Sequence, residues 1–120
     1  MRFHPSSGPH VDAAIRDLTS PSVTVRREAA SALGQTTTRR PEVISALGDA
    51  LADPDDEVRF AAALALGTLG DANAFDALLT LLHDPAPLPR QGAAVALGDL
   101  GDARAFSALV SAMNDPVADV

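Results

Sequence analysis

Apolar residues recur along most of the chain at the three- and four-residue spacing that places them on one face of a helix. Residues 58–69 show this clearly, since positions 58, 62, 65, 66 and 69 are all apolar. Proline and glycine interrupt the pattern at regular intervals, and both are typical of helix ends. The pattern predicts seven helices, near residues 10–19, 22–34, 41–52, 55–69, 72–83, 88–100 and 103–114.

Three landmarks return in step along the chain. A proline follows a short polar stretch, an arginine stands early in the next apolar run, and a glycine ends each Ala-Leu-Gly triplet. The three series keep the same intervals as one another, and in each the first interval is slightly longer than any later one. The positions are Pro21, Pro54, Pro85 and Pro116; Arg26, Arg59 and Arg90; and Gly34, Gly67 and Gly98. A register kept over most of the chain is typical of a structural repeat.

Each repeat unit is expected to form a helical hairpin, which is too small to bury its own apolar face. Stacked neighbours can bury these faces against one another. We therefore predict an all-α fold, an α-solenoid of about three stacked helical hairpins with an N-terminal capping helix. The expected organisation is a flexible N-terminal segment at 1–9 and a repeat domain at 10–120. Its units would be 20–52, 53–83 and 84–114, with the start of a fourth at 115–120.

The second unit carries a family resemblance. Its Asp53-Pro54, Val58-Arg59 and Ala65-Leu66-Gly67, followed by Leu-Gly-Asp, resemble the short HEAT-like repeats named after phycobilisome lyases. The resemblance covers roughly residues 10–119 and implies the same helical stack. It implies little about activity, because that family includes lyases, hydroxylases and many adaptor modules.

Two units depart from the pattern. The first replaces Leu-Gly-Asp with a longer and more basic turn at residues 36–40. The third has Pro89 where the pattern has valine, after Pro85 and Pro87. Because proline is tolerated only in the first turn of a helix, we expect the helix of the third unit to start late. Gly92 should weaken that helix further.

Charge and composition exclude some classes of partner and favour one cellular location. The formal net charge is −7, and all nine basic residues are arginine. An acidic chain repels phosphate backbones, so nucleic acid is a poor partner. No apolar run approaches ~20 residues, so no membrane span is expected, and the first residues lack the apolar core of a signal peptide. The chain has no cysteine, which fits a reducing compartment and a cytoplasmic location.

Sequence motifs of catalysis and metal binding are weak. His4, His10 and His83 form neither an HExxH pattern nor a helical pair, and no histidine precedes a glutamate as in the iron-binding relatives that the resemblance suggests. The acidic residues at 53, 55 and 57 hint at a calcium loop, but Val58 stands where that loop needs glycine. We therefore expect a protein that is not an enzyme, with no metal and no cofactor.

Two surfaces are candidates for contact with a partner. In HEAT-like stacks the second helices line the concave side, where the variable outward positions would form a polar, mildly acidic face. They are Glu42, Ser45, Asp49, Asn73, Asp76, Thr80, His83, Arg104, Ser107 and Ser111. On the convex side Phe60, Leu64 and Val95 point away from the buried stripe and would form a small apolar patch. The repeated Arg26, Arg59 and Arg90 are assigned a structural role, bonding to the Asp-Pro turn of the neighbouring unit.

These observations favour a non-catalytic protein–protein interaction or scaffold module with a protein partner. One alternative is a subunit of a bilin-lyase-like or other protein-modifying assembly, which the resemblance alone suggests. A second is a structural fragment of a longer solenoid, because Asp115-Pro116 repeats the opening of a unit. Apolar residues near that end, Val110 and Met113, would then meet further repeats or support weak self-association.

Overall fold

The computed structural model describes residues 9–36, 38–101 and 109–110. The described residues form helices and turns and contain no strand. The helices are α1 (Pro9–Asp17), α2 (Val23–Gln35), α3 (Pro41–Ala50), α4 (Asp56–Leu69), the 3-10 turn η1 (Ala72–Ala74) with α5 (Phe75–Leu81), and α6 (Pro87–Leu100). The predicted all-α stack of helical hairpins is confirmed.

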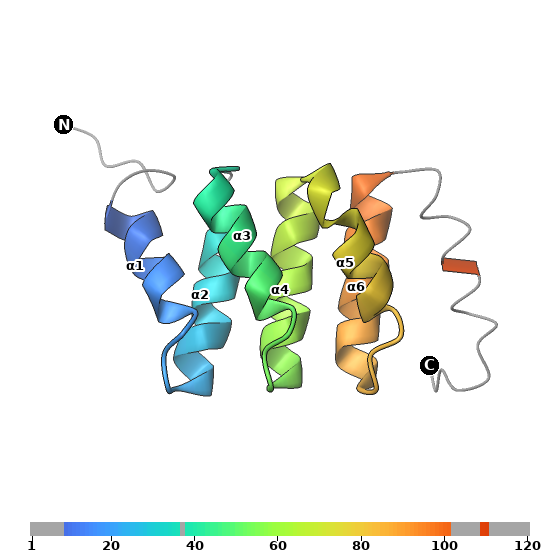
Figure 1. The fold of residues 1–120 in the computed structure, drawn as a ribbon, viewed down its shortest axis with the longest axis horizontal. Coiled ribbons are helices and arrows are strands. Elements are labelled where there is room, and N and C mark those ends of the chain that lie inside the picture. The colour runs from blue at the N-terminus through green and yellow to red at the C-terminus, as the bar shows by residue number, and fades with distance from the viewer. Residues whose placement is uncertain (1–8, 37, 102–108, 111–120) are drawn as a thin grey trace.

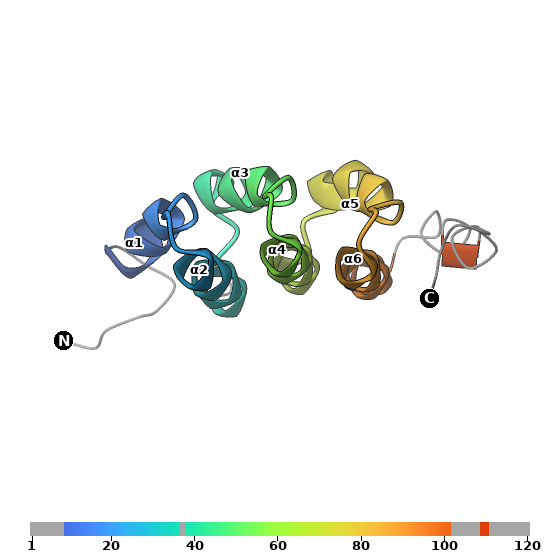
Figure 2. The ribbon, with the colours of Figure 1, turned by 90° about the horizontal axis from the view of Figure 1, so that it is seen from below.

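The helices lie in two rows (Figures 1 and 2). Figure 2 shows α2, α4 and α6 in one row and α1, α3 and α5 in the other. We call these the first-helix row and the second-helix row. The main core residues lie between the rows, and among the described residues no polar or charged one is buried. The largest fully buried side chains include Leu33, Leu47, Leu66, Leu78 and Leu97.

Local chemistry sets the helix ends. The Asp55 carboxylate accepts hydrogen bonds from the backbone N–H groups of Glu57 and Val58, at 2.9 and 3.2 Å, and so begins α4. Gly70 and Gly101 end α4 and α6 with φ of 72° and 65°, a conformation that glycine adopts without strain. The repeated Leu-Gly therefore stops each of these two helices at the same point of its unit.

Helices of the first-helix row touch almost without intervening side chains. A Cβ atom added at Gly67 would lie 2.6 Å from Ala96 Cα, and one at Gly34 would lie 2.9 Å from Ala65 Cα. Glycine and alanine at these positions allow the backbones of α2, α4 and α6 to approach closely. This contact repeats from unit to unit because the Ala-Leu-Gly triplet repeats.

The expected late start of the third unit's first helix was wrong. Helix α6 begins at Pro87 and α4 at Asp56, and each is the second residue after the proline of its own Asp-Pro turn. The two helices therefore start in full register. The first N–H groups of a helix have no partner inside it, so prolines at 87 and 89 lose no hydrogen bond there. Pro89 is fully buried in the core, at the position where the second unit has Val58.

The other described helix boundaries lie within two residues of the predicted ones. The segment at 72–83 begins as a 3-10 turn and ends as an α-helix at Leu81. Of the helix predicted near 103–114, only Leu109 and Val110 are described, and both are helical. Val110 is 42% exposed. The rest of that helix, with Met113, lies outside the described residues.

Candidate functional site

A groove of about 620 Å³ lies between α2 and α4. Its lining includes Gly34, Ala61 and Ala65, three residues with little or no side chain, together with the larger apolar residues Phe60 and Leu64. We call it the first-helix groove. The remaining lining residues are Arg27, Ser31, Gln35, Glu57, Thr68 and Leu88. The groove is thus apolar where α2 and α4 meet and has polar residues among its walls.

The groove exists because equivalent positions of the repeats carry side chains of different size. Phe60 and Leu64 on α4 correspond to Arg27 and Ser31 on α2. Arg27 forms an ion pair with Glu57, and Ser31 is small, so neither fills the space beside Leu64. The Arg27–Glu57 pair also links α2 to α4 along the groove wall.

Phe60 on α4 contacts α6 as well as lining the groove. A Cβ atom added at Gly92 would lie 2.9 Å from Phe60 Cδ1, so the ring packs on the open backbone of α6. Gly92, which costs α6 some helix propensity, is therefore what allows Phe60 to lie there. The ring becomes half-buried between two helices and still lines the groove.

The three residues of the predicted apolar patch lie on two neighbouring helices, α4 and α6. Phe60 and Leu64 are half-buried and line the first-helix groove together. Val95 lies on α6, is 52% exposed and is not among the residues that line the groove. That the three residues form one contact surface stays a prediction.

The predicted polar face lies on the second-helix row. Its exposed residues on α3 are Glu42, Ser45 and Asp49, and those of the second unit are Asn73, Asp76, Thr80 and His83. Arg104, Ser107 and Ser111 lie outside the described residues. Asp49 lines a second groove of about 540 Å³, whose other residues include Ile15 and Leu18 from the α1 segment. That this row is the concave side stays a prediction.

The pKa of Glu42, a residue of this face, is lowered by hydrogen bonding. Its carboxylate accepts hydrogen bonds from its own backbone N–H and from Arg40, and these lower its pKa. Hydrogen bonds to Asp12 and Glu42, at 3.0 and 3.2 Å, raise the pKa of Arg40 in turn. The bond from Arg40 to Asp12 joins α1 to the start of α3, which is a structural role at the rim of the stack.

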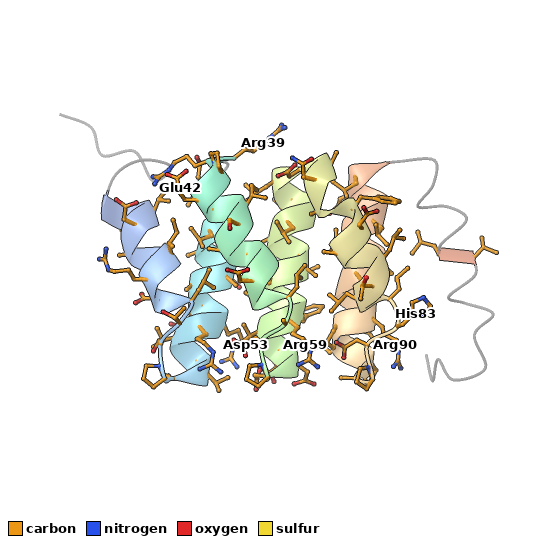
Figure 3. All side chains as sticks on the ribbon, in the orientation of Figure 1. Arg39, Glu42, Asp53, Arg59, His83 and Arg90 are labelled. Carbon is orange, nitrogen blue, oxygen red and sulfur yellow. The ribbon has the colours of Figure 1, made fainter. Side chains whose placement is uncertain are left out.

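Two of the repeated arginines, Arg26 and Arg59, join consecutive units along one edge of the stack, where Figure 3 shows Asp53, Arg59 and Arg90. Arg59 Nε and Nη2 donate to the two oxygens of Asp84 at 2.9 and 3.0 Å, while Nη1 donates to the Asp53 carbonyl oxygen at 2.7 Å. Arg26 makes the same set with Asp53 and the Ser20 carbonyl. We call this series the arginine ladder.

The comparison with protein families follows the same repeat. A family model described as HEAT repeats matches residues 11–89 and 44–120. The chain belongs to the HEAT repeat family. No curated protein matches it. HEAT repeats generally mediate protein–protein interaction and scaffolding. The match does not distinguish the phycobilisome-lyase type of repeat from other HEAT repeats.

No group of three or more histidine, cysteine, aspartate or glutamate side chains lies close enough to hold a metal ion in the part of the chain that the structure describes. His10 and His83 are exposed at opposite parts of the stack. None of the described helices is both long and apolar enough to cross a membrane.

Two of the groove residues, Phe60 and Leu64, were predicted from the sequence, whereas the α2 side of the groove was missed. That side is formed by Arg27, Ser31 and Gln35. A usable signal was present, because the outward positions of α2 hold small or polar residues one unit before the large apolar residues of α4. Such a step in side-chain size between neighbouring units leaves a hollow between their helices.

Proposed function

We propose that this HEAT repeat chain is a non-catalytic protein-interaction module and that the first-helix groove is its contact surface. The observation that supports this most is the pairing of half-buried Phe60 and Leu64 over a base of glycine and alanine. Apolar surface left open in this way marks a contact site more often than scattered exposed residues do. The interaction role of HEAT repeats in general agrees with it.

The shape of the groove favours a helical segment as the bound element. From Glu57 to Thr68 the groove follows about 16 Å of α4, or about three helical turns. A helix with apolar residues three and four positions apart can lay one face against such a surface. Arg27 and Glu57 bring both signs of charge to the wall, so the partner needs polar residues at its flanks but no strong net charge.

Two matched substitutions test the proposal. Ser31 and Thr80 are both exposed hydroxyl residues within helices, one lining the groove on α2 and the other on α5 in the second-helix row. Ser31→Arg fills the groove, whereas Thr80→Arg places the same side chain on the other row. We expect partners captured from a native lysate by the wild-type chain to be retained by Thr80→Arg and lost with Ser31→Arg, with mass spectrometry as the readout.

If Thr80→Arg abolishes capture and Ser31→Arg does not, the contact surface is the polar second-helix face instead. If neither variant changes what is captured, or if no protein is retained above the level of a scrambled control surface, the interaction proposal is wrong. Circular dichroism of each variant separates loss of binding from loss of fold, because the spectrum should stay helical in both.

Two finer assignments are proposed on the sequence alone. The match at Asp53-Pro54, Val58-Arg59 and Leu69-Gly70-Asp71 supports the short phycobilisome-lyase type of HEAT repeat. The lack of cysteine supports a cytoplasmic location. Neither is needed for the groove to bind a partner.

A further inference from the structure

The outer side of the first-helix row carries both a hollow and a protruding apolar residue. The hollow is the first-helix groove beside Leu64. The protruding residue is Val95 on α6, the most exposed large apolar side chain that the structure describes. Figure 2 shows α2, α4 and α6 side by side along this face, and no other described helix lies against their outer side. The chain thus presents two apolar features of opposite shape on one face.

The two features lie at the same level of the stack. Ser31, Leu64 and Val95 hold the same place in successive units. The three helices that carry them run side by side in the same direction, as Figure 1 shows, so equivalent residues have the same height along the helix axes. Serine in the first unit leaves the hollow open, leucine in the second lines it, and valine in the third protrudes.

We propose that a second copy of this chain occupies the first-helix groove and that Val95 of each copy enters the groove of the other. The inference rests on the proposed function, because it names the helix that the groove binds, the outer face of α6. A two-fold axis parallel to the first helices turns one copy to face the other and moves no residue along those helices. Val95 of one copy therefore comes to the level of Ser31 and Leu64 in the other, and the symmetry makes this contact twice.

The polar residues on either side of Val95 suit this pairing. One helical turn before Val95, Gln91 of one copy comes to the level of Arg27 in the other, because these positions are equivalent in the repeat. One turn after it, Asp99 comes to the level of Gln35 for the same reason. A neutral amide thus meets the guanidinium, and a carboxylate meets an amide that can donate a hydrogen bond. No two like charges face each other at these levels.

The available area predicts a weak dimer. The groove follows about 16 Å of α4, and three helices at the usual spacing extend over about 25 Å. The contact is then roughly 400 Å² per copy, about half of what a stable interface buries on each partner. The net charge of −7 on each copy adds a repulsion that salt screens. We therefore expect dimers at about 1 mM chain and monomers at about 10 μM.

Sedimentation equilibrium of the purified full chain tests the self-association. The wild type should pass from monomer to dimer over that concentration range. Val95→Glu places a charge in the apolar groove of the other copy, so it should raise the dimer Kd by about tenfold or more. Val110→Glu is the matched control, because Val110 is another exposed valine and belongs to no helix of the first-helix row. It should leave the Kd unchanged.

Disulfide trapping tests which surfaces meet, since the chain has no cysteine of its own. A chain carrying both Ser31→Cys and Val95→Cys should form dimers joined by two disulfides under mild oxidation, as mass spectrometry can show. Within one chain these positions lie two helices apart, too far for an internal disulfide. Thr80→Cys with Val95→Cys is the control on the other row. It should be trapped at least about tenfold more slowly, because those surfaces meet only by collision.

The proposal is wrong if the wild type stays monomeric at about 1 mM, or if the two double-cysteine chains are trapped equally fast. It is also wrong if Val110→Glu abolishes the dimer and Val95→Glu does not, because the contact would then lie at the end of the stack. A monomeric chain that loses its lysate partner with Ser31→Arg would give the groove to another protein and leave the proposed function standing. A trapped dimer that captures nothing from a lysate would support this pairing and contradict an outside partner.

Discussion

The geometry of the guanidinium group explains why arginine recurs at positions 26, 59 and 90. Its planar donors reach in two directions, so Arg59 holds its own turn through Nη1 and the next turn through Nε and Nη2. A lysine ammonium has no such rigid fork, and the chain contains no lysine. The Asp84 carboxylate also has two tasks, because its Oδ1 accepts from the Ala86 backbone N–H at 2.9 Å. Each rung therefore shapes a turn and joins two units.

Replacing Asp84 should lower the free energy of unfolding substantially. Asp84→Asn keeps an oxygen acceptor for the turn but removes the charge and one hydrogen bond to Arg59, whose side chain is 15% exposed. We expect the free energy of unfolding to fall by about 1–3 kcal/mol in urea titrations. Asp99→Asn removes an exposed charge near the end of α6 and should change it by no more than about 0.5 kcal/mol. Equal effects of the two substitutions would contradict a role for the rung.

At the scale of the helix, glycine affects stability in opposite ways at different positions. Gly67 faces the Ala96 backbone, and any side chain there must push α4 and α6 apart. Gly48 on α3 has no atom within 4 Å of an added Cβ, so it loses helix propensity without any gain in packing. The glycines that end the triplets at Gly34 and Gly67 thus form helix contacts, whereas Gly48 of the similar Ala-Leu-Gly at residues 46–48 does not.

Alanine substitutions should separate these two cases by sign. Gly67→Ala is expected to lower the free energy of unfolding by about 1–3 kcal/mol, because overpacking outweighs the better helix propensity. Gly48→Ala should raise it by about 0.5–1 kcal/mol. Thermal and urea unfolding of both variants gives the comparison. A stabilising Gly67→Ala would show that α4 and α6 are not in the close contact described.

At the scale of the molecule, the chain is a short linear stack. Helix α4 contacts both α2 and α6. Helix α3 packs mainly on α4, and α5 packs mainly on α6. Stability in such a stack is a sum of units and of interfaces between neighbours. A change at one interface should therefore be felt most by the units on either side of it.

Hydrogen exchange read by mass spectrometry can test this locality. With Gly67→Ala at the α4–α6 interface, amide exchange in α6 should speed up by about tenfold. Exchange in α1, two helices away in the stack, should change several-fold less. The matched Gly48→Ala variant should accelerate neither. Uniform acceleration from α1 to α6 would mean that the stack unfolds as one cooperative unit.

Features that depend on neighbouring residues were readable from the sequence. The capping carboxylate of Asp55 and the left-handed Gly70 act through backbone geometry and hydrogen bonds within one or two turns. In the repeat register Ser22 takes the capping position in the first unit and Gly101 takes the glycine position in the third. They fixed the helices and their order to within a few residues. The start of α6 was misjudged because burial of Pro89 was not considered together with its missing N–H.

The sequence by itself determined a stack of helical hairpins, since a repeated apolar stripe that no hairpin can bury leaves stacking as the stable arrangement. Only the tertiary structure decided where the surface is hollow. The first-helix groove depends on Phe60 lying on Gly92 and on Arg27 turning to Glu57, and in each pair the second residue belongs to the next unit. Side chains so far apart in the sequence meet only after the helices pack, and their fit depends on the spacing of the backbones.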